Sequence, residues 1–592
     1  MKYHLSDLIR IAGAALALGL SLSGFLPYII IPVAATLICG YPMFKEAFDA
    51  IRERHMTMEL SMSIAVMATL LVGQYTTGLV ITLFVLIAEL LEHLIVDRGR
   101  DALTGLAALM PQTAKDLQPG DTVVVKPGSH IPVDGIVLKG NSFVNQAAIT
   151  GESLPVEKSL NSEVLAGTIN QDGVLEIIAT SVGKDTVFGR IIGVMESIRT
   201  TQSPIEKTAD KLAARLVYFA LGGAVITYLI THNINATISA LVVTGACGVA
   251  AGTPLAILAG IGRAAREGVV IKGGVYLEQL AQADTVILDK TGTLTLNQAV
   301  VTDITSFDGI GRNMLLTLLS TGEQHSDHPL AGAIMDAAKK EAILPVDYDT
   351  YNYLPGKGLE FSRQNTRYLI GNAGLFAENN IDLHVAQQWL DTARQNGEST
   401  VLISNDQHIL GGARIIDVIR SEAREAISDL HDHHLRTILL SGDNAASVAG
   451  TGKSLRVDEA IGNLLPADKL GYISSLKSRG HKVIMVGDGI NDAPALMEAN
   501  VGIAMGTSSH VAFESADMVL TNNDLRKVAT AITIARKCMN VIQFNFWGTI
   551  IVDAIGIVLA FLGYLSPMTA AMIHVGSELI FILNAARLFR KG

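Results

Sequence analysis

The residues with the clearest chemical potential follow one short apolar run. Val286–Leu288 is typical of a buried parallel strand, and Asp289 comes directly after it. Open α/β sheets bind their ligands at the carboxyl ends of strands. The next residues, Lys290-Thr-Gly-Thr293, supply a cation, two hydroxyls and a flexible backbone, which suit a phosphoryl group. A carboxylate so placed can accept a phosphoryl group covalently. For a lone aspartate, a strand end with a turn is the more ordinary interpretation, but the full Asp289-Lys-Thr-Gly-Thr-Leu-Thr295 string is too specific for it.

Two further apolar runs end in acidic turns. Thr437–Leu440 precedes Ser441-Gly-Asp443, and Val483–Val486 precedes Gly487-Asp-Gly-Ile-Asn-Asp492. Because the carboxyl ends of parallel strands meet at one edge of a sheet, these turns should converge with Asp289. For Asp443 alone, a helix N-cap is an equally good interpretation.

Oxygen ligands beside a phosphate suit Mg²⁺. We expect Asp488 to bind Mg²⁺ together with Asp289, with the Thr291 backbone as a third ligand and Asn491 and Asp492 in support. Ser441 and Lys469, the latter in Pro466-Ala-Asp-Lys469, would neutralise the phosphoryl oxygens during transfer.

The composition indicates a membrane protein of several domains. The chain has 592 residues, of which 49% are hydrophobic and 17% charged, and its mean hydropathy is +0.38. The net charge of −11 argues against nucleic acid as a partner. The cysteines Cys39, Cys247 and Cys538 form no CxxC pair, so neither a disulfide framework nor a zinc finger is expected.

Eight apolar runs are long enough to span a bilayer. They lie near residues 8–25, 27–43, 60–75, 78–96, 212–231, 235–262, 541–563 and 567–586. The short connections within each pair carry no Lys or Arg, whereas the opposite ends do. The positive-inside rule therefore places both termini and both large polar inserts in the cytoplasm.

The first insert is rich in Val, Ile and Gly and should be mostly β. It contains Thr150-Gly-Glu152, a turn that could expose one carboxylate to orient water for hydrolysis. A glutamate in such a turn is otherwise an ordinary solvated surface residue.

Within the second insert, residues 298–415 separate the first strand from the next and should form their own domain. Its signals are Glu323, Ser326-Asp-His-Pro-Leu330, Gly356-Lys-Gly358 and Ile370-Gly-Asn372. A His-Pro turn could contact an adenine, and closely spaced glycines let a purine approach the backbone.

Together these motifs resemble the heavy-metal-transporting P-type ATPases of the CPx branch, from the first span to the last. The resemblance implies that Asp289 is phosphorylated and that Glu152 helps water to remove the phosphate. It implies Mg²⁺ and ATP as cofactors, with ATP bound by Glu323, His328, Gly356, Gly358 and Asn372. No Gly-x-x-Cys-x-x-Cys segment precedes the first span, so no N-terminal metal-binding domain is expected.

The expected fold is an eight-helix transmembrane domain with a β-rich actuator domain, an α/β haloacid-dehalogenase-like phosphorylation domain and an α+β nucleotide-binding domain. The expected segments are transmembrane helices 1–4 with an interfacial platform (1–97), the actuator domain (98–205), transmembrane helices 5–6 (206–267), the phosphorylation domain (268–297 and 416–540), the nucleotide-binding domain (298–415) and transmembrane helices 7–8 (541–592). The platform would be the basic amphipathic stretch 41–57, for which an ordinary helix end is an equal alternative. The location would be the plasma membrane, the inner membrane in bacteria.

The membrane site departs from the familiar members of this branch. In Ala250-Ala-Gly-Thr-Pro-Leu255, Thr253 and Leu255 flank Pro254 where copper and zinc exporters place cysteine. Pro254 should break the helix and free backbone carbonyls. Cys247 is nearby in sequence, but a lone cysteine in a span is more often a small core residue. A Cu⁺ site is therefore disfavoured.

The other polar residues of the spans are harder ligands. They are Glu89, Glu92, His93, Gln543, Asn545, Asp553, His574 and Glu578. His574 and Glu578, at i and i+4, would share a helix face. Imidazole and carboxylate favour a divalent cation such as Zn²⁺, Co²⁺, Ni²⁺, Fe²⁺ or Mn²⁺. The open alternatives are that Asp553 anchors an interface and that His574 satisfies a carbonyl; Glu89 resembles an exit-path carboxylate of the family.

The resulting hypothesis is ATP-driven export of a divalent metal cation through a lipid bilayer, with a cytoplasmic metal donor as a candidate partner. One alternative is a membrane-bound phosphatase of the same α/β fold. Such enzymes usually carry a second acid two residues after the nucleophile, where this chain has Thr291. The other alternative is a pump for K⁺ or an alkaline-earth cation.

Overall fold

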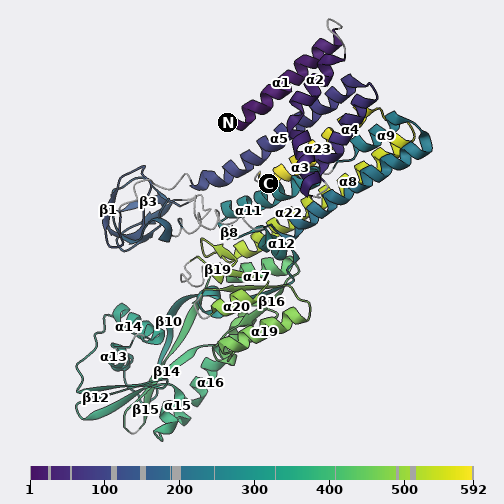
Figure 1. Ribbon diagram of the computed structural model, residues 1–592. Coiled ribbons are helices and arrows are strands. Elements are labelled where there is room, and N and C mark those ends of the chain that lie inside the picture. Colours follow the sequence, from purple (N-terminus) through teal and green to yellow (C-terminus); the bar gives the residue numbers. More distant parts are fainter. Residues whose placement is uncertain are drawn as a thin grey trace. The chain divides into compact units, whose positions relative to one another are not determined.

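A computed structural model describes residues 2–23, 29–53, 57–107, 117–146, 155–186, 189, 202–245, 247–326, 328–406, 408–488, 492–506 and 515–589 (Figure 1). The chain divides into two compact units. The first comprises Met1–Ala281 and Ala531–Gly592, and the second comprises Gln282–Thr530.

The second unit contains the sheet that carries Asp289. The strands that this unit contributes follow the order β17 (Glu459–Ile461), β16 (Arg436–Leu440), β9 (Thr285–Asp289), β18 (Val483–Gly487), β19 (Val501–Met505) and β20 (Met518–Leu520). All these pairs are parallel. The central strands β9, β18 and β19 are buried along their whole length, as expected of a parallel sheet covered on both faces. The helices of this region are α17 (Ala423–Asp432), α18 (Ala445–Leu455), α19 (Pro466–Ser478) and α20 (Ala493–Glu498).

The register of β9 with its neighbours brings the three acidic turns to one edge. Asp289 lies opposite Leu440 of β16, and Leu288 lies opposite Val486 of β18. Ser441 and Asp488 follow these neighbouring strands within two residues, so both lie at the same edge as Asp289. The predicted convergence of strand ends is confirmed.

An antiparallel sheet is inserted after β9. Its order is β10 (Thr295–Ser306), β15 (Ile409–Ile419), β14 (Ser399–Ser404), β13 (Thr366–Gly371), β12 (Gly358–Arg363) and β11 (Thr350–Leu354). The long strands β10 and β15 pair with each other and connect the insert to the sheet that carries Asp289.

Alternation along the strands gives this inserted sheet two apolar faces. Val401 and Ile403 of β14 join a core with α13 (Arg312–Glu323) and α14 (Pro329–Lys340). Leu402 points the other way, into a core with α15 (Ala373–Glu378) and α16 (Gln387–Asn396). The sheet therefore lies between two helical layers (Figure 1).

The first insert is a β domain, as predicted. One sheet has the order β1 (Thr122–Val125), β7 (Leu175–Ser181), β2 (Asp134–Lys139) and β5 (Glu163–Val164). The other has the order β4 (Val156–Lys158), β3 (Ser142–Asn145) and β6 (Ile169–Asn170). Residues of both sheets form one buried core, which includes Val125, Val137, Val144, Leu175 and Ile177.

The first unit also holds the apolar helices. They are α1 (Lys2–Leu22), α2 (Ile30–Cys39), α3 (Tyr41–Glu53), α4 (Met58–Leu71), α5 (Tyr75–Ala107), α8 (Pro204–Thr231), α9 (Ile234–Val243), α10 (Cys247–Ala250), α11 (Gly252–Arg266), α22 (Arg526–Phe561) and α23 (Pro567–Ala586). Each of the eight predicted runs overlaps a helix. Among the described residues, five helical stretches are long and apolar enough to cross a membrane, and three shorter apolar helices accompany them.

Helix α3 occupies most of the predicted platform. It begins directly after Gly40, and Met43, Ala47 and Ala50 form its buried face. Phe48 and Ile51 are exposed on the other side. Apolar residues thus lie on both faces of this helix, which suits a helix at a bilayer interface.

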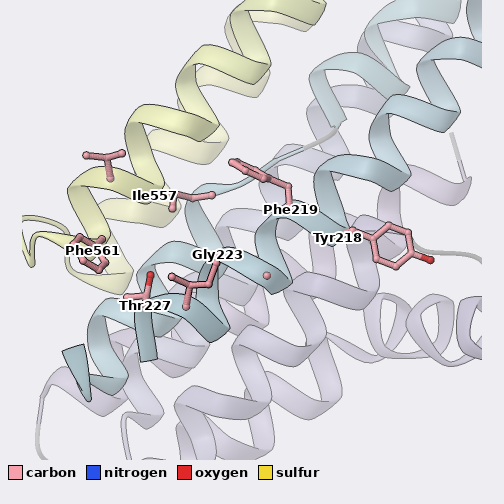
Figure 2. A pocket seen from close by; sticks show the side chains of 9 residues that line it. Tyr218, Phe219, Gly223, Thr227, Ile557 and Phe561 are labelled. Carbon is pink, nitrogen blue, oxygen red and sulfur yellow. The ribbon is translucent and has the colours of Figure 1, made fainter. Parts of the chain in front are cut away.

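The surfaces of α8 and α22 form an apolar groove (Figure 2). Gly222 and Gly223 of α8 leave room beside Ile557 and Phe561 of α22, and the groove has a volume of about 380 Å³. Thr227 and Tyr218 are the hydroxyl-bearing residues of an otherwise apolar lining. This wall composition is that of a lipid-facing surface.

The predicted span near 235–262 is interrupted twice. Helix α9 ends at Val243, and the chain leaves helical geometry at Thr244 and Gly245. Helices α10 and α11 are then separated at Ala251, within a turn of Pro254. The helix break expected from Pro254 is confirmed, and the break at Gly245 is a second one that Pro254 does not explain.

We expect Phe361→Ala to destabilise the inserted domain by about 3–5 kcal/mol, because large-to-small changes in a core leave a cavity. Phe361 is fully buried and stacks on Tyr368 with 5.0 Å between ring centroids. Trp389 lies in the same domain, so its fluorescence in a Trp547→Phe background reports domain unfolding in urea. The control Val385→Ala, at a residue 65% exposed, should shift the transition little. Equal shifts of the urea unfolding transition in the two variants would contradict the placement of Phe361 in the core of the inserted domain.

Candidate functional site

The loop after Asp289 depends on a glycine. Gly292 has a φ of +71°, the left-handed region that favours glycine. A side chain at this position would also collide with the Asp488 carboxylate. Arg420 holds the loop from the other side, since its guanidinium donates to the carbonyl oxygens of Thr293 at 2.8 Å and Gly292 at 3.0 Å. The close approach of the loop to Asp488 therefore requires glycine at 292.

Lys469 connects two buried carboxylates. Its Nζ lies 2.5 Å from Asp289 Oδ1 and 2.8 Å from Asp492 Oδ1, and all three side chains are buried. Burial lowers the pKa of Lys469, but the two carboxylates outweigh this effect and the pKa lies above its ordinary value. Lys469 is therefore a fixed cation beside Asp289.

The carboxylates outnumber this cation. Ligand oxygens of Asp289, Asp488 and Asp492 lie within 4.8 Å of one another. Burial, and then the Asp492 carboxylate, raises the pKa of Asp289 to about 7 although Lys469 opposes the shift. The same two causes raise the pKa of Asp488 to about 6. A cluster of hard oxygen donors whose charge is not balanced fits Mg²⁺.

The other residues predicted for this edge, Ser441, Asp443 and Thr291, lie at the same sheet edge as Asp289 but make different contacts. Ser441 is buried, and its Oγ accepts a hydrogen bond from the Asp443 amide at 3.1 Å. Asp443 pairs with Lys290, whose Nζ lies 2.5 Å from Asp443 Oδ2. Asp443 is thus an ion-pair partner of the loop after Asp289. The helix-cap interpretation considered for it from the sequence is wrong, because Asn444 is the N-cap of α18 and accepts from the Ala446 amide at 2.9 Å. Thr291 is exposed at the edge.

The predicted nucleotide-binding residues line one pocket of about 180 Å³. They are Glu323, His328, Gly356, Gly358 and Asn372, together with Ser326, Tyr353 and Lys357 among others. Burial raises the pKa of Glu323 against the opposing effect of the Ser326 hydroxyl. Residues from α13, the start of α14, the β11–β12 turn and the start of α15 meet here, so the sequence-distant motifs form a single pocket.

Two of these residues also cap helices. His328 precedes α14, and its Nδ1 accepts from the Leu330 amide at 3.2 Å. Asn372 precedes α15, accepts from the Leu375 amide at 3.1 Å and donates to the Gly356 carbonyl at 3.2 Å. The Nε2 atom of His328 remains available for a ligand while Nδ1 fixes the ring.

In the helices of the first unit, polar groups face the break at Gly245. Asp553 Oδ1 accepts from the Gly245 amide at 3.1 Å, and a side chain at Gly245 would collide with the His574 ring. His574 Nε2 lies 3.7 Å from Glu578 Oε2, and these three side chains are buried. Within the described part of the chain, Asp553 Oδ2 and both ring nitrogens of His574 have no hydrogen-bond partner.

Other predicted membrane residues have local roles. The Thr253 hydroxyl donates to the Val249 carbonyl at 2.7 Å. Asn545 donates to the Phe581 carbonyl at 3.0 Å and accepts from Asn584 at 2.8 Å, which joins α22 to α23. Glu89 is half-buried on α5. Glu152 and Asn491, and the side chains of Cys247, Glu92 and His93, lie outside the described residues.

Sequence reasoning missed two contributors. Arg420 follows β15 with no motif around it, and only the fold brings it to the Asp289 loop. The Gly245 break lacks proline, so helical periodicity gave no signal for it. Asp492 was expected in a supporting role, yet its oxygen lies in the carboxylate cluster itself.

Comparisons with known families agree with this geometry. Residues 108–196 match the P-type ATPase actuator domain, and residues 283–500 match the haloacid dehalogenase-like hydrolases. A second match to haloacid dehalogenase-like hydrolases covers residues 471–532.

Similar proteins cover most of the chain. A protein of Listeria monocytogenes named probable cadmium-transporting ATPase is 35% identical over 94% of this chain and 83% of its own length. A copper-exporting P-type ATPase of Staphylococcus aureus is 34% identical over 87% of this chain and 66% of its own length. A solved zinc-transporting PIB-type ATPase in its E2.Pi state has a TM-score of 0.64 at 30% identity, with both chains fully covered. The chain therefore belongs to the heavy-metal-transporting P-type ATPases, which hydrolyse ATP to move metal cations across a membrane.

Proposed function

We propose that this chain exports a divalent transition-metal cation, of the Zn, Co, Ni, Fe or Mn class, through an aspartyl-phosphate on Asp289. The observation that supports this most directly is the buried Asp289 carboxylate, held 2.5 Å from Lys469 Nζ at the end of β9. In attack on the γ-phosphorus of ATP, an Asp289 oxygen forms the new P–O bond while the bond to ADP breaks. Lys469 and the Ser441 hydroxyl stabilise the negative charge on the phosphoryl oxygens.

Asp289, Asp488 and the Thr291 backbone would hold Mg²⁺, which neutralises charge on the phosphate when bound. The pocket of Glu323, His328, Gly356, Gly358 and Asn372 would bind ATP. Glu152 is proposed to orient the water that releases phosphate from Asp289, a role that rests on the family resemblance.

For the cargo, the proposed ligands are His574, Glu578 and Asp553. Unpartnered buried imidazole nitrogens and a carboxylate oxygen support a cation site, because burying such groups without partners is costly. Imidazole with carboxylate favours a borderline divalent metal, and the absence of cysteine beside Pro254 argues against Cu⁺. The related proteins named for cadmium and zinc are consistent with a divalent cargo.

The proposed topology has eight spans with both termini and both inserts in the cytoplasm of a bacterial inner membrane. The distribution of Lys and Arg supports this orientation. Three shorter helices, Ile30–Cys39, Glu59–Leu71 and Tyr75–Leu91, would complete the five longer spans. A cytoplasmic donor could deliver metal near α3.

Incubation with γ-³²P-ATP and Mg²⁺ should yield an acid-stable phosphoprotein that Asp289→Asn abolishes, because the amide is not a nucleophile. The ³²P label on the Asp289→Asn protein, measured on acidic gels, should fall to background. Asp347→Asn, at an exposed carboxylate in the inserted domain, is the control and should keep full labelling. Phosphate release without any trapped label would instead support a phosphatase of this fold.

Without Mg²⁺, Asp488→Asn should stabilise the protein at pH 7.5 by roughly 1–2 kcal/mol, because the ionised Asp488 is crowded by other carboxylates. Its pKa of about 6 exceeds the ordinary value, so the destabilisation grows as pH rises from about 4 to 6 and persists above it. The advantage of the variant should therefore shrink as pH falls below 6.

The measurement is thermal unfolding in detergent across pH, with and without Mg²⁺. Mg²⁺ should raise the melting temperature of the wild type and of Asp347→Asn, but raise that of Asp488→Asn much less. A variant less stable than the wild type at pH 7.5 without Mg²⁺ would exclude charge crowding at this site.

His574→Ala and Glu578→Ala should each weaken stimulation of ATP hydrolysis by Zn²⁺, Co²⁺, Ni²⁺, Fe²⁺ or Mn²⁺. The metal concentration that gives half-maximal stimulation should rise at least about tenfold, because each variant removes one proposed ligand. ATP binding should be unchanged, because the nucleotide pocket belongs to the other unit. The assay is ATPase activity in vesicles with a panel of metals, and Met572→Ala, at an exposed residue of the same helix, is the control. Stimulation by K⁺ or Ca²⁺ alone would contradict the proposed cargo class.

A further inference from the structure

The first turn of helix α8 donates a hydrogen bond to a side chain of a different helix. Glu278 belongs to α12 (Gly274–Gln282), and its Oε2 accepts from the Ile205 amide at 2.9 Å. The amides of a first helical turn have no partner within their own helix, and the positive end of the helix dipole favours a carboxylate. Glu278 thereby ties α12 to the start of α8.

This bond is additional to a complete cap within α8 itself. The Glu206 amide donates to Ser203 Oγ at 3.3 Å, and the Ser203 amide donates to Glu206 Oε2 at 2.5 Å, which forms a capping box. Glu278 is half-buried close to Glu206, so the helix start holds two carboxylates. The local needs of α8 are met by Ser203 and Glu206, and the distinctive contribution of Glu278 is its link to another helix.

Helix α12 also packs on α11. A side chain at Gly274 would lie 2.9 Å from Ile257 Cγ2, and a side chain at Gly260 would lie 3.0 Å from Leu277 Cδ2. These close approaches show that α12 and α11 are in direct contact through glycines. Gly274 also approaches Ser203, at 3.3 Å to its Cβ. Helix α12 thus contacts both the start of α8 and the middle of α11.

The two helices that α12 contacts both belong to the proposed membrane spans. Helix α11 contains Pro254 and follows the break at Gly245, and α8 is one of the long apolar stretches. At its other end, α12 finishes at Gln282, three residues before β9, whose last residue is Asp289. The connection between α12, which contacts α8 and α11, and the strand that carries Asp289 is therefore very short, consisting of Ala283 and Asp284.

We propose that Glu278 is a positioning residue that couples phosphorylation at Asp289 to movement of α8 and α11. The inference rests on the proposed aspartyl-phosphate function. A displacement of β9 on phosphorylation moves α12, and the hydrogen bond from the Ile205 amide to Glu278 makes α8 follow. Without the bond, α12 can move while α8 stays, so hydrolysis proceeds with less transport.

The test measures metal uptake and ATP hydrolysis in the same inverted vesicles, with Zn²⁺ as the first probe. Glu278→Ala should lower metal transported per ATP about fivefold or more, the usual size of a coupling effect. Glu278→Gln keeps an acceptor of the same length and should retain wild-type coupling. Glu278→Asp keeps the charge but is one methylene shorter, and it should be uncoupled like alanine.

Glu206→Ala is the matched control, because it also removes one acceptor from the first turn of α8 but breaks no link between helices. It should lower thermal stability while leaving transport per ATP unchanged. The proposal is overturned if Glu206→Ala and Glu278→Asp transport the same amount of metal per ATP. It is also overturned if Glu278→Gln transports as little metal per ATP as Glu278→Ala. Should Glu278→Ala fail to fold, the comparison of Glu278→Gln with Glu278→Asp decides in the same way.

Acid-stable phosphoprotein is measured on every variant in parallel. Trapped label in the Glu278 variants with reduced transport per ATP supports the coupling role. Absent label in the wild type would refute the aspartyl-phosphate itself, whereas normal label with normal coupling in Glu278→Ala and Glu278→Asp would refute only the role of Glu278.

Discussion

The proposed phosphorylation edge is the sheet edge where Asp289, Ser441 and Asp488 meet. It depends on the contacts of the Lys469 ammonium with the Asp289 and Asp492 carboxylates. Removing three like charges from water is costly unless cations compensate them, and one lysine compensates only part. The part of this cost that Lys469 does not offset appears as the raised pKa values of Asp289 and Asp488. The uncompensated charge of this edge favours a divalent cation, and such a cation would favour the ionised form of Asp289, the proposed nucleophile.

Much of this edge could be predicted because its determinants are local. Buried apolar runs followed by Asp289, Ser441 and Asp488 indicate parallel strands, and strand ends of one sheet necessarily converge. The insertion of a second domain between β9 and β16 also followed from chain order. Arg420 could not be predicted in the same way, because nothing near it in sequence indicates that the β15 end returns to the Gly292 loop.

The helices of the first unit show where sequence reasoning reaches its limit. Thr253 and Asn545 are both polar and buried, yet each has a structural partner, the Val249 carbonyl and the Phe581 carbonyl respectively. Asp553 and His574 are of similar polarity but retain unpartnered atoms in the described structure. Residue type identifies which positions are costly to bury, whereas only the packing of α22 and α23 decides which of them remain available for a ligand.

The two proposed cation sites use the same electrostatic principle with different ligand atoms. At the phosphorylation edge the ligands are carboxylate oxygens beside a permanent ammonium, which suits a hard ion that keeps part of its water and phosphate shell. In the membrane helices, His574 brings two nitrogens beside the Glu578 carboxylate, and imidazole is a ligand that Mg²⁺ and K⁺ do not favour. A chain with both sets can use Mg²⁺ for catalysis at one site and bind a different metal at the other, because the donor atoms rather than the charge discriminate between the two ions.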